Sequence, residues 1–199
     1  MEISAKQVKE LRELTGVGFM ECKAALTEAS GDLNKAVTIL RTKGKAKAEK
    51  RAGRTTGQGL IGTYIHQGGQ VGVLVEMNCE SDFVSRTDDF QALLKEIAMH
   101  IAAANPVCVN RDAVPVEDLE REKDIYLAQA KESKKPPNVI DKIVEGKLNS
   151  YYSQIVLLDQ PSIRDPKIKI SDLINTAIAK LGENITISRF SRFKIGEKS

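Results

Sequence analysis

The sequence of 199 residues predicts an α+β protein in which three N-terminal helices precede a core of antiparallel sheet with packed helices. Three observations support this prediction. Residues 4–40 carry apolar side chains at helical spacing, with two turn-forming interruptions. Residues 57–77 form two β-type segments on either side of a Gly-Gly pair, which is typical of a hairpin. Residues 185–193 alternate apolar and polar side chains, which indicates a strand that most simply pairs with the hairpin.

The N-terminal unit is expected to be a compact bundle of three short helices with a modest core. Ser4 and Gln7 match a capping box at the start of the first helix. A Thr-Gly-Val-Gly segment ends that helix, and the second is expected at residues 19–29. After a Ser-Gly-Asp turn, Asp32 can cap the third helix. The apolar residues available for packing in this bundle are Val8, Leu11, Leu14, Met20, Ala24, Ala25, Leu33, Ala36, Val37 and Leu40.

Residues 41–54 are strongly basic, with seven cations and a single acid, Glu49. The simpler interpretation is a solvated linker or a helical extension. The alternative is a strip that contacts phosphates, because lysine and arginine dominate non-specific nucleic-acid affinity. No aromatic residue is interleaved, which weakens that alternative. The expected domains are therefore a helical unit with a basic linker at 1–53 and an α+β core at 54–199. The cations are Arg41, Lys43, Lys45, Lys47, Lys50, Arg51 and Arg54.

The core is expected to contain four helices between the hairpin and the last strand. The first begins near Asp88 and stops before an Asn-Pro pair, because proline cannot continue a helix. Residues 151–158 fit either a helix or a strand, and a helix is preferred. The last helix is expected to be capped by Ser171 and closed by Gly182. The four helices are expected at residues 88–104, 116–134, 138–158 and 171–181.

Composition and charge argue against several classes of protein. The formal net charge of +3 does not require a nucleic-acid partner, and an aromatic content of 5% without tryptophan argues against base-stacking platforms. We therefore expect no DNA partner. No apolar run approaches the roughly 20 residues that a membrane span needs, so no membrane contact is expected. The chain begins with an amphipathic helix rather than with the pattern of a secretory signal peptide.

The chemistry-bearing residues do not match an enzyme site. Cys22, Cys79 and Cys108 lack metal-site spacing and are interpreted as reduced, mostly buried thiols of a cytoplasmic protein. Neither a phosphate-binding loop nor a dinucleotide motif is present in the sequence. We expect no covalent catalysis, no cofactor and no metal. If a site were assembled from scattered residues, the candidates would be Glu80, Asp82 and His66.

Residues 81–84, Ser-Asp-Phe-Val, follow the end of an apolar strand and precede a long helix. We call these four residues the tip. The simpler interpretation is that Phe83 packs under the strand-to-helix turn and that Asp82 caps a helix end. The alternative is an exposed probe for a partner, because neither the strand nor the helix needs this acid and this ring for its own packing.

Three segments of the chain resemble the bacterial elongation factor Ts family. They are Leu-Arg-Glu-Leu-Thr-Gly-Val-Gly-Phe-Met-Glu-Cys-Lys-Ala-Ala-Leu at 11–26, Glu-Met-Asn-Cys-Glu-Ser-Asp-Phe-Val at 76–84 and Lys-Leu-Gly-Glu-Asn-Ile at 180–185. The resemblance runs essentially end to end. Ser81 stands where relatives usually have threonine, and Ala24 stands where a polar residue is common. Longer members carry a second core subdomain and an extended coiled-coil hairpin, so this chain resembles the short subclass, for which a homodimer is expected.

The resemblance implies a guanine-nucleotide exchange factor that binds GDP-bound elongation factor Tu. Its first unit would be a ubiquitin-associated-like three-helix domain. By matching positions, the residues that dock on the GTPase domain would be Arg12, Phe19, Met20 and Lys23. The residues of the loop that disturbs the magnesium site would be Ser81, Asp82, Phe83 and Val84.

The expected mechanism uses the two prominent side chains of the tip. Phe83 would act as an apolar wedge, and Asp82 would bring negative charge near the magnesium shell; both effects would weaken GDP binding. The main competing hypothesis is a nucleic-acid-binding or ribosome-associated protein that uses residues 41–54, and it predicts an RNA affinity that falls steeply with salt.

Overall fold

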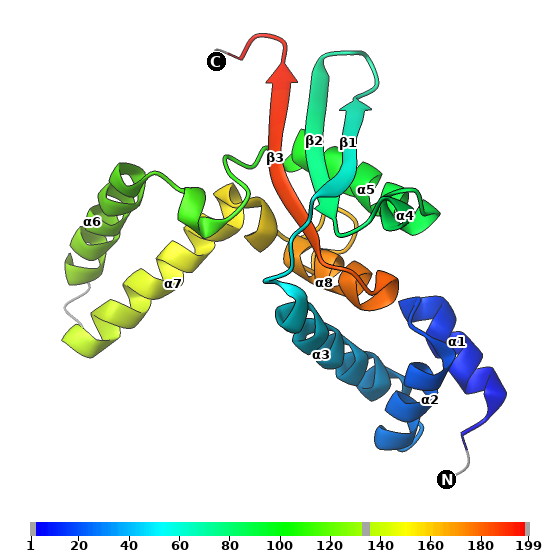
Figure 1. Cartoon of the computed structure of the whole chain (residues 1–199). Coiled ribbons are helices and arrows are strands. Elements are labelled where there is room, and N and C mark those ends of the chain that lie inside the picture. Colours follow the sequence, from blue (N-terminus) through cyan, green and yellow to red (C-terminus); the bar gives the residue numbers. More distant parts are fainter. Residues whose placement is uncertain (1–2, 133–135, 198–199) are drawn as a thin grey trace. The chain divides into compact units, whose positions relative to one another are not determined.

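The computed structural model describes residues 3–132 and 136–197 and has the predicted α+β architecture (Figure 1). The described residues form one three-stranded sheet with the order β1-β2-β3, so the C-terminal strand lies beside the hairpin as expected. The strands are β1 (Gln58–Ile65), β2 (Val71–Cys79) and β3 (Ile185–Lys194). The α-helices are α1 (Ala5–Thr15), α2 (Phe19–Glu28), α3 (Leu33–Arg51), α4 (Asp82–Ser85), α5 (Asp88–Ala104), α6 (Val116–Glu132), α7 (Pro137–Ile155) and α8 (Ile170–Leu181).

The chain groups into two compact units, and each strand of the sheet contributes residues to both. The first unit comprises Met1–Ile61, Met77–Leu94 and Asp172–Thr186. The second unit comprises Gly62–Glu76, Lys95–Ser171 and Ile187–Ser199. The division at residue 53 that the sequence suggests stays a prediction.

Helix α1 begins and ends with the signals that the sequence predicts. The Gln7 amide donates to the Ser4 hydroxyl at 3.3 Å, and the Ser4 amide donates to the Gln7 side chain at 3.0 Å, which completes the capping box. Gly16 ends the helix with φ +67°, and its amide donates to the Arg12 carbonyl at 2.7 Å. Glycine is favoured there because other residues adopt this left-handed conformation at a cost.

The bundle core uses one face of each of the first three helices. Leu14 and Met20, which were expected to pack, are instead exposed by 64% and 72%, and Ala24 is also exposed. Their spacing follows the helical period, but a helix at the surface of a small bundle buries only one stripe. The buried residues of this core are Val8, Leu11, Val17, Cys22, Ala25, Leu26, Ala29, Ala36 and Leu40.

Helix α3 is 19 residues long, so the prediction of three short helices is wrong for the third one. The basic stretch continues this helix as far as Arg51, which selects the helical extension over a flexible linker. Helix α3 packs against α8 within the first unit. Arg41 pairs with Asp172 at 3.3 Å, the Arg51 guanidinium donates to the Ile178 carbonyl at 3.4 Å, and a Cβ at Gly44 would contact the Ala179 side chain.

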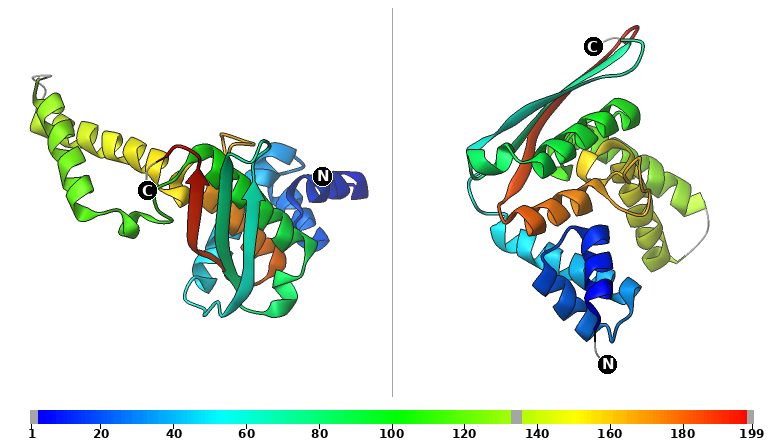
Figure 2. Two further views of the ribbon diagram at one scale, coloured as in Figure 1. Left: turned by 90° about the horizontal axis from the view of Figure 1, so that it is seen from above. Right: turned by 90° about the vertical axis from the view of Figure 1, so that its right-hand side faces the viewer.

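The hairpin turn is formed by residues 66–70, as the Gly-Gly pair predicts. The His66 amide donates to the Val71 carbonyl at 2.8 Å, and Gly68 and Gly69 both have positive φ. In the second unit, α5 covers one face of the sheet, whereas the opposite face carries no helix in the described chain (Figure 2). This arrangement explains why Val73 and Val75 are buried while the intervening Leu74 is exposed.

Helices α6 and α7 form an antiparallel hairpin in the second unit (Figure 1). Residues 133–134 of the expected 116–134 helix lie outside the described residues. Helix α7 ends at Ile155, and Val156 then makes a single parallel bridge with Cys108, so residues 151–158 are mostly helical, as preferred. No helix among the described residues has the length and apolar character needed to cross a membrane.

Helix α8 starts before the predicted cap. The helix begins at Ile170, so Ser171 lies inside the first turn and is not the cap. An antiparallel bridge between Pro161 and Lys169, followed by an Ile170 amide that donates to the Gln160 carbonyl at 3.0 Å, determines where the chain enters the helix. Gly182 closes α8 with φ +81°, as expected.

Candidate functional site

The tip forms the single-turn helix α4 and presents Phe83 to solvent. Phe83 is 81% exposed, so the interpretation in which it packs under the turn is wrong. Ser81 is the cap of α4, because its hydroxyl accepts the Val84 amide at 3.5 Å; Asp82 is the first helical residue and not the cap. The tip therefore exposes a large aromatic ring without burying it in either neighbouring element.

Asp82 is held on the surface by its own helix. Its carboxylate pairs with Arg86, four residues on, at 2.7 Å; Arg86 is exposed and Asp82 is half-buried. An exposed pair at this spacing contributes little to stability. Asp82 can consequently exchange Arg86 for another cation at small cost.

Two carboxylates fix the chain where the tip begins. Glu183 accepts both the amide of Ser81 at 3.0 Å and its hydroxyl at 2.6 Å. Glu80 accepts the amide of Asn184 at 2.7 Å. The buried Ser85 hydroxyl also donates to the Asp82 carbonyl at 2.8 Å, which closes the turn from below. Phe83 is thus exposed on a backbone that is hydrogen-bonded on both sides.

Cys79 lies buried directly before the tip and is not a nucleophile candidate. Its thiol donates to the Ser81 carbonyl at 3.0 Å. Burial raises the pKa of Cys79, and the negative charge of Glu183 raises it further. The thiol is therefore protonated at neutral pH and supports the turn.

The second surface lies at the end of the bundle where α1 meets α2. The four predicted docking residues, Arg12, Phe19, Met20 and Lys23, are all exposed there. Phe19 is exposed by 44%, and neither Arg12 nor Lys23 has an ion pair within the described chain. The structure adds Leu14, which the sequence assigned to the core because it follows Leu11 by three residues. We call these five residues the α1–α2 patch.

The α1–α2 loop is held from inside the bundle and from α8. The buried Cys22 thiol donates to the Val17 carbonyl at 3.4 Å. The side chain of Lys180 lies 3.2 Å from where a Cβ of Gly16 would stand, and its ammonium group pairs with Asp89 in the first turn of α5 at 2.6 Å. Lys180 therefore touches both the loop of the patch and the helix that follows the tip, within the first unit.

The candidates for an enzyme site have structural roles. Glu80 bonds the Asn184 amide and pairs with Arg54 at 3.5 Å, while the His66 ring bonds the Tyr64 hydroxyl at 3.1 Å. Over residues 3–132 and 136–197, no group of three or more His, Cys, Asp and Glu side chains is arranged to hold a metal ion. Nothing in the described chain assembles these residues into a site.

The basic stretch does not form a free strip of cations. Four of its seven cations make ion pairs with acids of the same unit, which leaves fewer charges for phosphate groups. The pairs are Arg41–Asp172, Lys43–Glu28, Lys47–Glu21 and Arg54–Glu80.

Comparison with known proteins identifies the family. The profile of the family described as Elongation factor TS matches residues 4–197. Curated relatives called Elongation factor Ts include the protein of Fervidobacterium nodosum, 58% identical over 197 residues, covering 99% of this chain and 100% of the relative. The protein of Caldanaerobacter subterraneus is 58% identical over 195 residues, covering 98% of each chain. That of Geobacter sulfurreducens is 54% identical over 197 residues, covering 99% of this chain and 91% of the relative. The chain therefore belongs to the elongation factor Ts family.

Proposed function

We propose that this protein binds GDP-bound elongation factor Tu and promotes release of GDP, so that GTP can bind in its place. Family membership implies a translation elongation factor that exchanges nucleotide on elongation factor Tu and performs no covalent chemistry. The observation that carries the detailed proposal is the exposed ring of Phe83 on a hydrogen-bonded turn. We assign the protein to the cytoplasm, where its partner works.

Docking would begin at the α1–α2 patch. This patch belongs to the N-terminal three-helix bundle, which we propose is a ubiquitin-associated-like domain. Leu14, Phe19 and Met20 offer apolar area, and Arg12 and Lys23 add cations that have no ion pair within the described residues. Exposed aromatic and methionine side chains beside arginine are typical of the centre of a protein interface. The patch would supply binding energy that does not depend on the state of the nucleotide.

Phe83 would act after docking, as a wedge between elements of the GTPase. A tenfold loss of GDP affinity requires about 1.4 kcal/mol of coupling, and GDP must weaken the binding of this protein by the same factor. Burying one phenylalanine side chain contributes roughly 1.5–3 kcal/mol. The ring alone therefore accounts for one or two decades of lost GDP affinity, and the patch, which binds equally in both nucleotide states, holds the complex together while the ring acts.

Asp82 would act on the phosphate and magnesium side of the partner's site. A GTPase holds GDP through backbone amides around the phosphates and through a magnesium ion. A carboxylate brought to that shell competes with the phosphate for cations and amide donors. The weak surface pair with Arg86 leaves Asp82 available for this contact. The protein itself needs no cofactor in this scheme.

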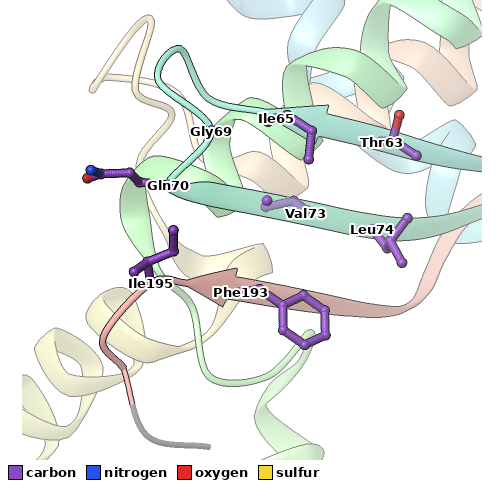
Figure 3. Close-up of a pocket in the computed structure, with 9 residues that line it drawn as sticks. Thr63, Ile65, Gly69, Gln70, Val73, Leu74, Phe193 and Ile195 are labelled. Carbon is purple, nitrogen blue, oxygen red and sulfur yellow. The ribbon is translucent and has the colours of Figure 1, made fainter.

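The proposal includes a homodimer formed through the uncovered face of the sheet. In the second unit this face carries an open groove of about 570 Å³, lined by apolar side chains from all three strands (Figure 3). Ile65, Phe193 and Ile195 are each exposed by about two thirds or more. The same face on a second copy would be self-complementary, as a two-fold interface requires. The resemblance implies that longer members of the family carry a second core subdomain, and a second copy of this chain would supply an equivalent surface.

Oligomeric state tests the homodimer directly. We expect wild-type protein to sediment as a dimer at micromolar concentration and Phe193→Glu to sediment as a monomer, because the variant buries a charge in an apolar interface. Glu120→Gln, on the exposed side of α6, is the matched control and should not change the mass. A wild-type monomer over the whole concentration range would contradict the proposal.

Stimulated GDP release tests the function. A fluorescent GDP analogue bound to elongation factor Tu is mixed with the protein in a stopped-flow instrument. We expect the release rate to rise with protein concentration and to saturate. If release is unchanged while RNA binding is tight and falls steeply with salt, the function based on the basic stretch replaces this proposal.

A further inference from the structure

We infer that Glu183 is a positioning residue for the tip, and that it works in a polar brace together with Glu80 and Asn184. The inference rests on the proposed function, because its consequence is the rate at which the bound partner loses GDP. All three residues belong to the first unit, which also contains the tip and the α1–α2 patch. None of the three was singled out by the sequence as part of the docking or magnesium-site machinery.

Glu183 holds the first residue of the tip by two hydrogen bonds. The Ser81 amide donates to one carboxylate oxygen at 3.0 Å, and the Ser81 hydroxyl donates to the other at 2.6 Å. Hydrogen bonds to an ionised acceptor are shorter and stronger than neutral ones. A carboxylate accepts both donors as an ionised group, whereas the isosteric glutamine would accept the Ser81 amide through one oxygen and donate its amide group to the Ser81 hydroxyl, which replaces two charge-assisted bonds by neutral ones. The negative charge of Glu183 therefore determines how firmly Ser81 is held.

Asn184 continues the brace to the end of helix α3. Its side-chain amide donates to the Arg54 carbonyl at 2.9 Å and to the Ala52 carbonyl at 3.5 Å, and only 3% of the residue is exposed. Its backbone amide donates to Glu80 at 2.7 Å. Residues 183 and 184 therefore connect the last helix of the docking bundle with both residues that begin the turn of the tip.

The brace has a kinetic consequence because an ordered tip need not lose entropy when it enters the partner. Ordering the backbone of one residue costs about 1–2 kcal/mol, so a tip that must order during exchange would act about tenfold more slowly for each residue released. The α1–α2 patch docks through other side chains. Loosening the tip should therefore lower the maximal exchange rate and leave the docking affinity almost unchanged.

The first measurement is the concentration dependence of stimulated GDP release for Glu183→Gln and wild type, with Glu120→Gln as the matched control. We expect Glu183→Gln to lower the saturating rate about tenfold. Its half-saturating concentration should stay within about twofold of wild type, because the patch is not in contact with the change. The control should match wild type in both quantities. A saturating rate equal to wild type would overturn the inference.

The second measurement is amide hydrogen exchange over residues 81–87 of the free protein. A substitution that does not loosen the tip would not accelerate exchange selectively in this segment. We expect faster exchange in this segment for Glu183→Gln and no change for Glu120→Gln. Slower GDP release without faster exchange at the tip would overturn the positioning role. If wild type itself fails to accelerate GDP release, the proposed function fails, and hydrogen exchange still shows whether Glu183 orders the tip.

A milder variant covers the case in which Glu183→Gln does not fold. Ser81→Ala removes the 2.6 Å bond to Glu183 and the 3.5 Å capping bond from the Val84 amide, but it keeps the bond from the Ser81 amide to Glu183. It should shift the saturating rate in the same direction by a smaller factor. In the double variant, the loss of rate should be smaller than the sum of the losses, in free energy, of the two single variants, because both substitutions act on one contact. Full additivity would contradict a role of Glu183 through Ser81.

Discussion

Gly59 in β1 lies directly against the backbone of β2. Its φ is +150°, and a Cβ built there would lie 2.3 Å from the Met77 carbonyl oxygen of the neighbouring strand. No side chain fits at that distance, and the obstacle is backbone that cannot rotate away. The glycine therefore allows the beginning of the hairpin and the strand before the tip to lie against each other.

We expect Gly59→Ala to lower the free energy of unfolding by roughly 2–4 kcal/mol, through strain at this φ together with the clash. Gly57→Ala is the control, because a Cβ there meets nothing within 4 Å and its φ is not positive. Urea unfolding of both variants measures the difference. Equal stability of the two variants would show that the strand backbone adapts.

His100 is a buried histidine that resists protonation. Its Nε2 faces the Gln160 side-chain oxygen at 2.9 Å, while its Nδ1 is buried without a hydrogen-bond partner in the described chain. Burial lowers the pKa of His100 from 6.5, and the bond to Gln160 and the charge of Glu96 oppose this shift only in part. The folded protein therefore keeps the ring neutral at a pH where the unfolded chain binds a proton.

The sign of the pH dependence follows from this difference. Below pH 6.5 the unfolded state binds more protons than the folded state, so stability falls as the pH is lowered toward the folded pKa. The slope cannot exceed about 1.4 kcal/mol per pH unit for one group. Chemical unfolding between pH 7.5 and pH 5.5 should show this loss in wild type and in His66→Gln. In His100→Leu the loss should disappear; its persistence there would assign the effect to another group.

Helix α3 carries the basic stretch and also packs against α8. From the sequence alone, its basic residues could form a strip that contacts phosphates. In the structure, Arg41 pairs with an acid of α8, and Lys43 and Lys47 pair with acids of α2. Gly44 lies on the face toward α8, where a Cβ would stand 3.5 Å from that of Ala179, an ordinary contact distance. One methyl group fits there and a larger side chain does not.

Two substitutions at Gly44 should therefore have opposite effects. Gly44→Ala should stabilise the protein by up to about 1 kcal/mol, because alanine is the better helix former and the contact is not strained. Gly44→Leu should destabilise it by about 1–3 kcal/mol through overpacking against α8. Thermal unfolding shows whether each variant is more or less stable than wild type. If Gly44→Leu were neutral, α3 would not be packed on α8 in solution.

The elements themselves were largely predictable because their signals are local. A capping box and a left-handed glycine delimit α1, and the Gly-Gly pair forms the hairpin turn. The sequence did not show that α3 extends through the basic residues, since a charged solvent-facing helix and a charged linker have similar composition. Leu14 was assigned to the core because it follows Leu11 at helical spacing. Such spacing shows which residues share a face of the helix, but not at which turn that face becomes exposed.

At the scale of the whole molecule, the site depends on contacts that no local pattern predicts. Glu183 and Ser81 are 102 residues apart in the chain, and Arg54 and Asn184 are 130 apart. The resemblance to the family named the tip and four of the five residues of the patch, and the fold shows which hydrogen bonds and ion pairs hold the backbone around them. The exposure of Phe83 is the one result that decides between the two interpretations of the tip, because it removes a packing role for the ring.

The two exposed phenylalanines of the first unit allow the most direct test of the mechanism. In stimulated GDP release from elongation factor Tu, Phe83→Ala should lower the saturating rate about tenfold or more, since it removes the wedge. Phe19→Ala should instead raise the half-saturating concentration and leave the saturating rate close to wild type, since it removes docking area only. If Phe83→Ala releases GDP at the wild-type saturating rate, or if both variants change the same parameter, the division between docking patch and wedge is contradicted.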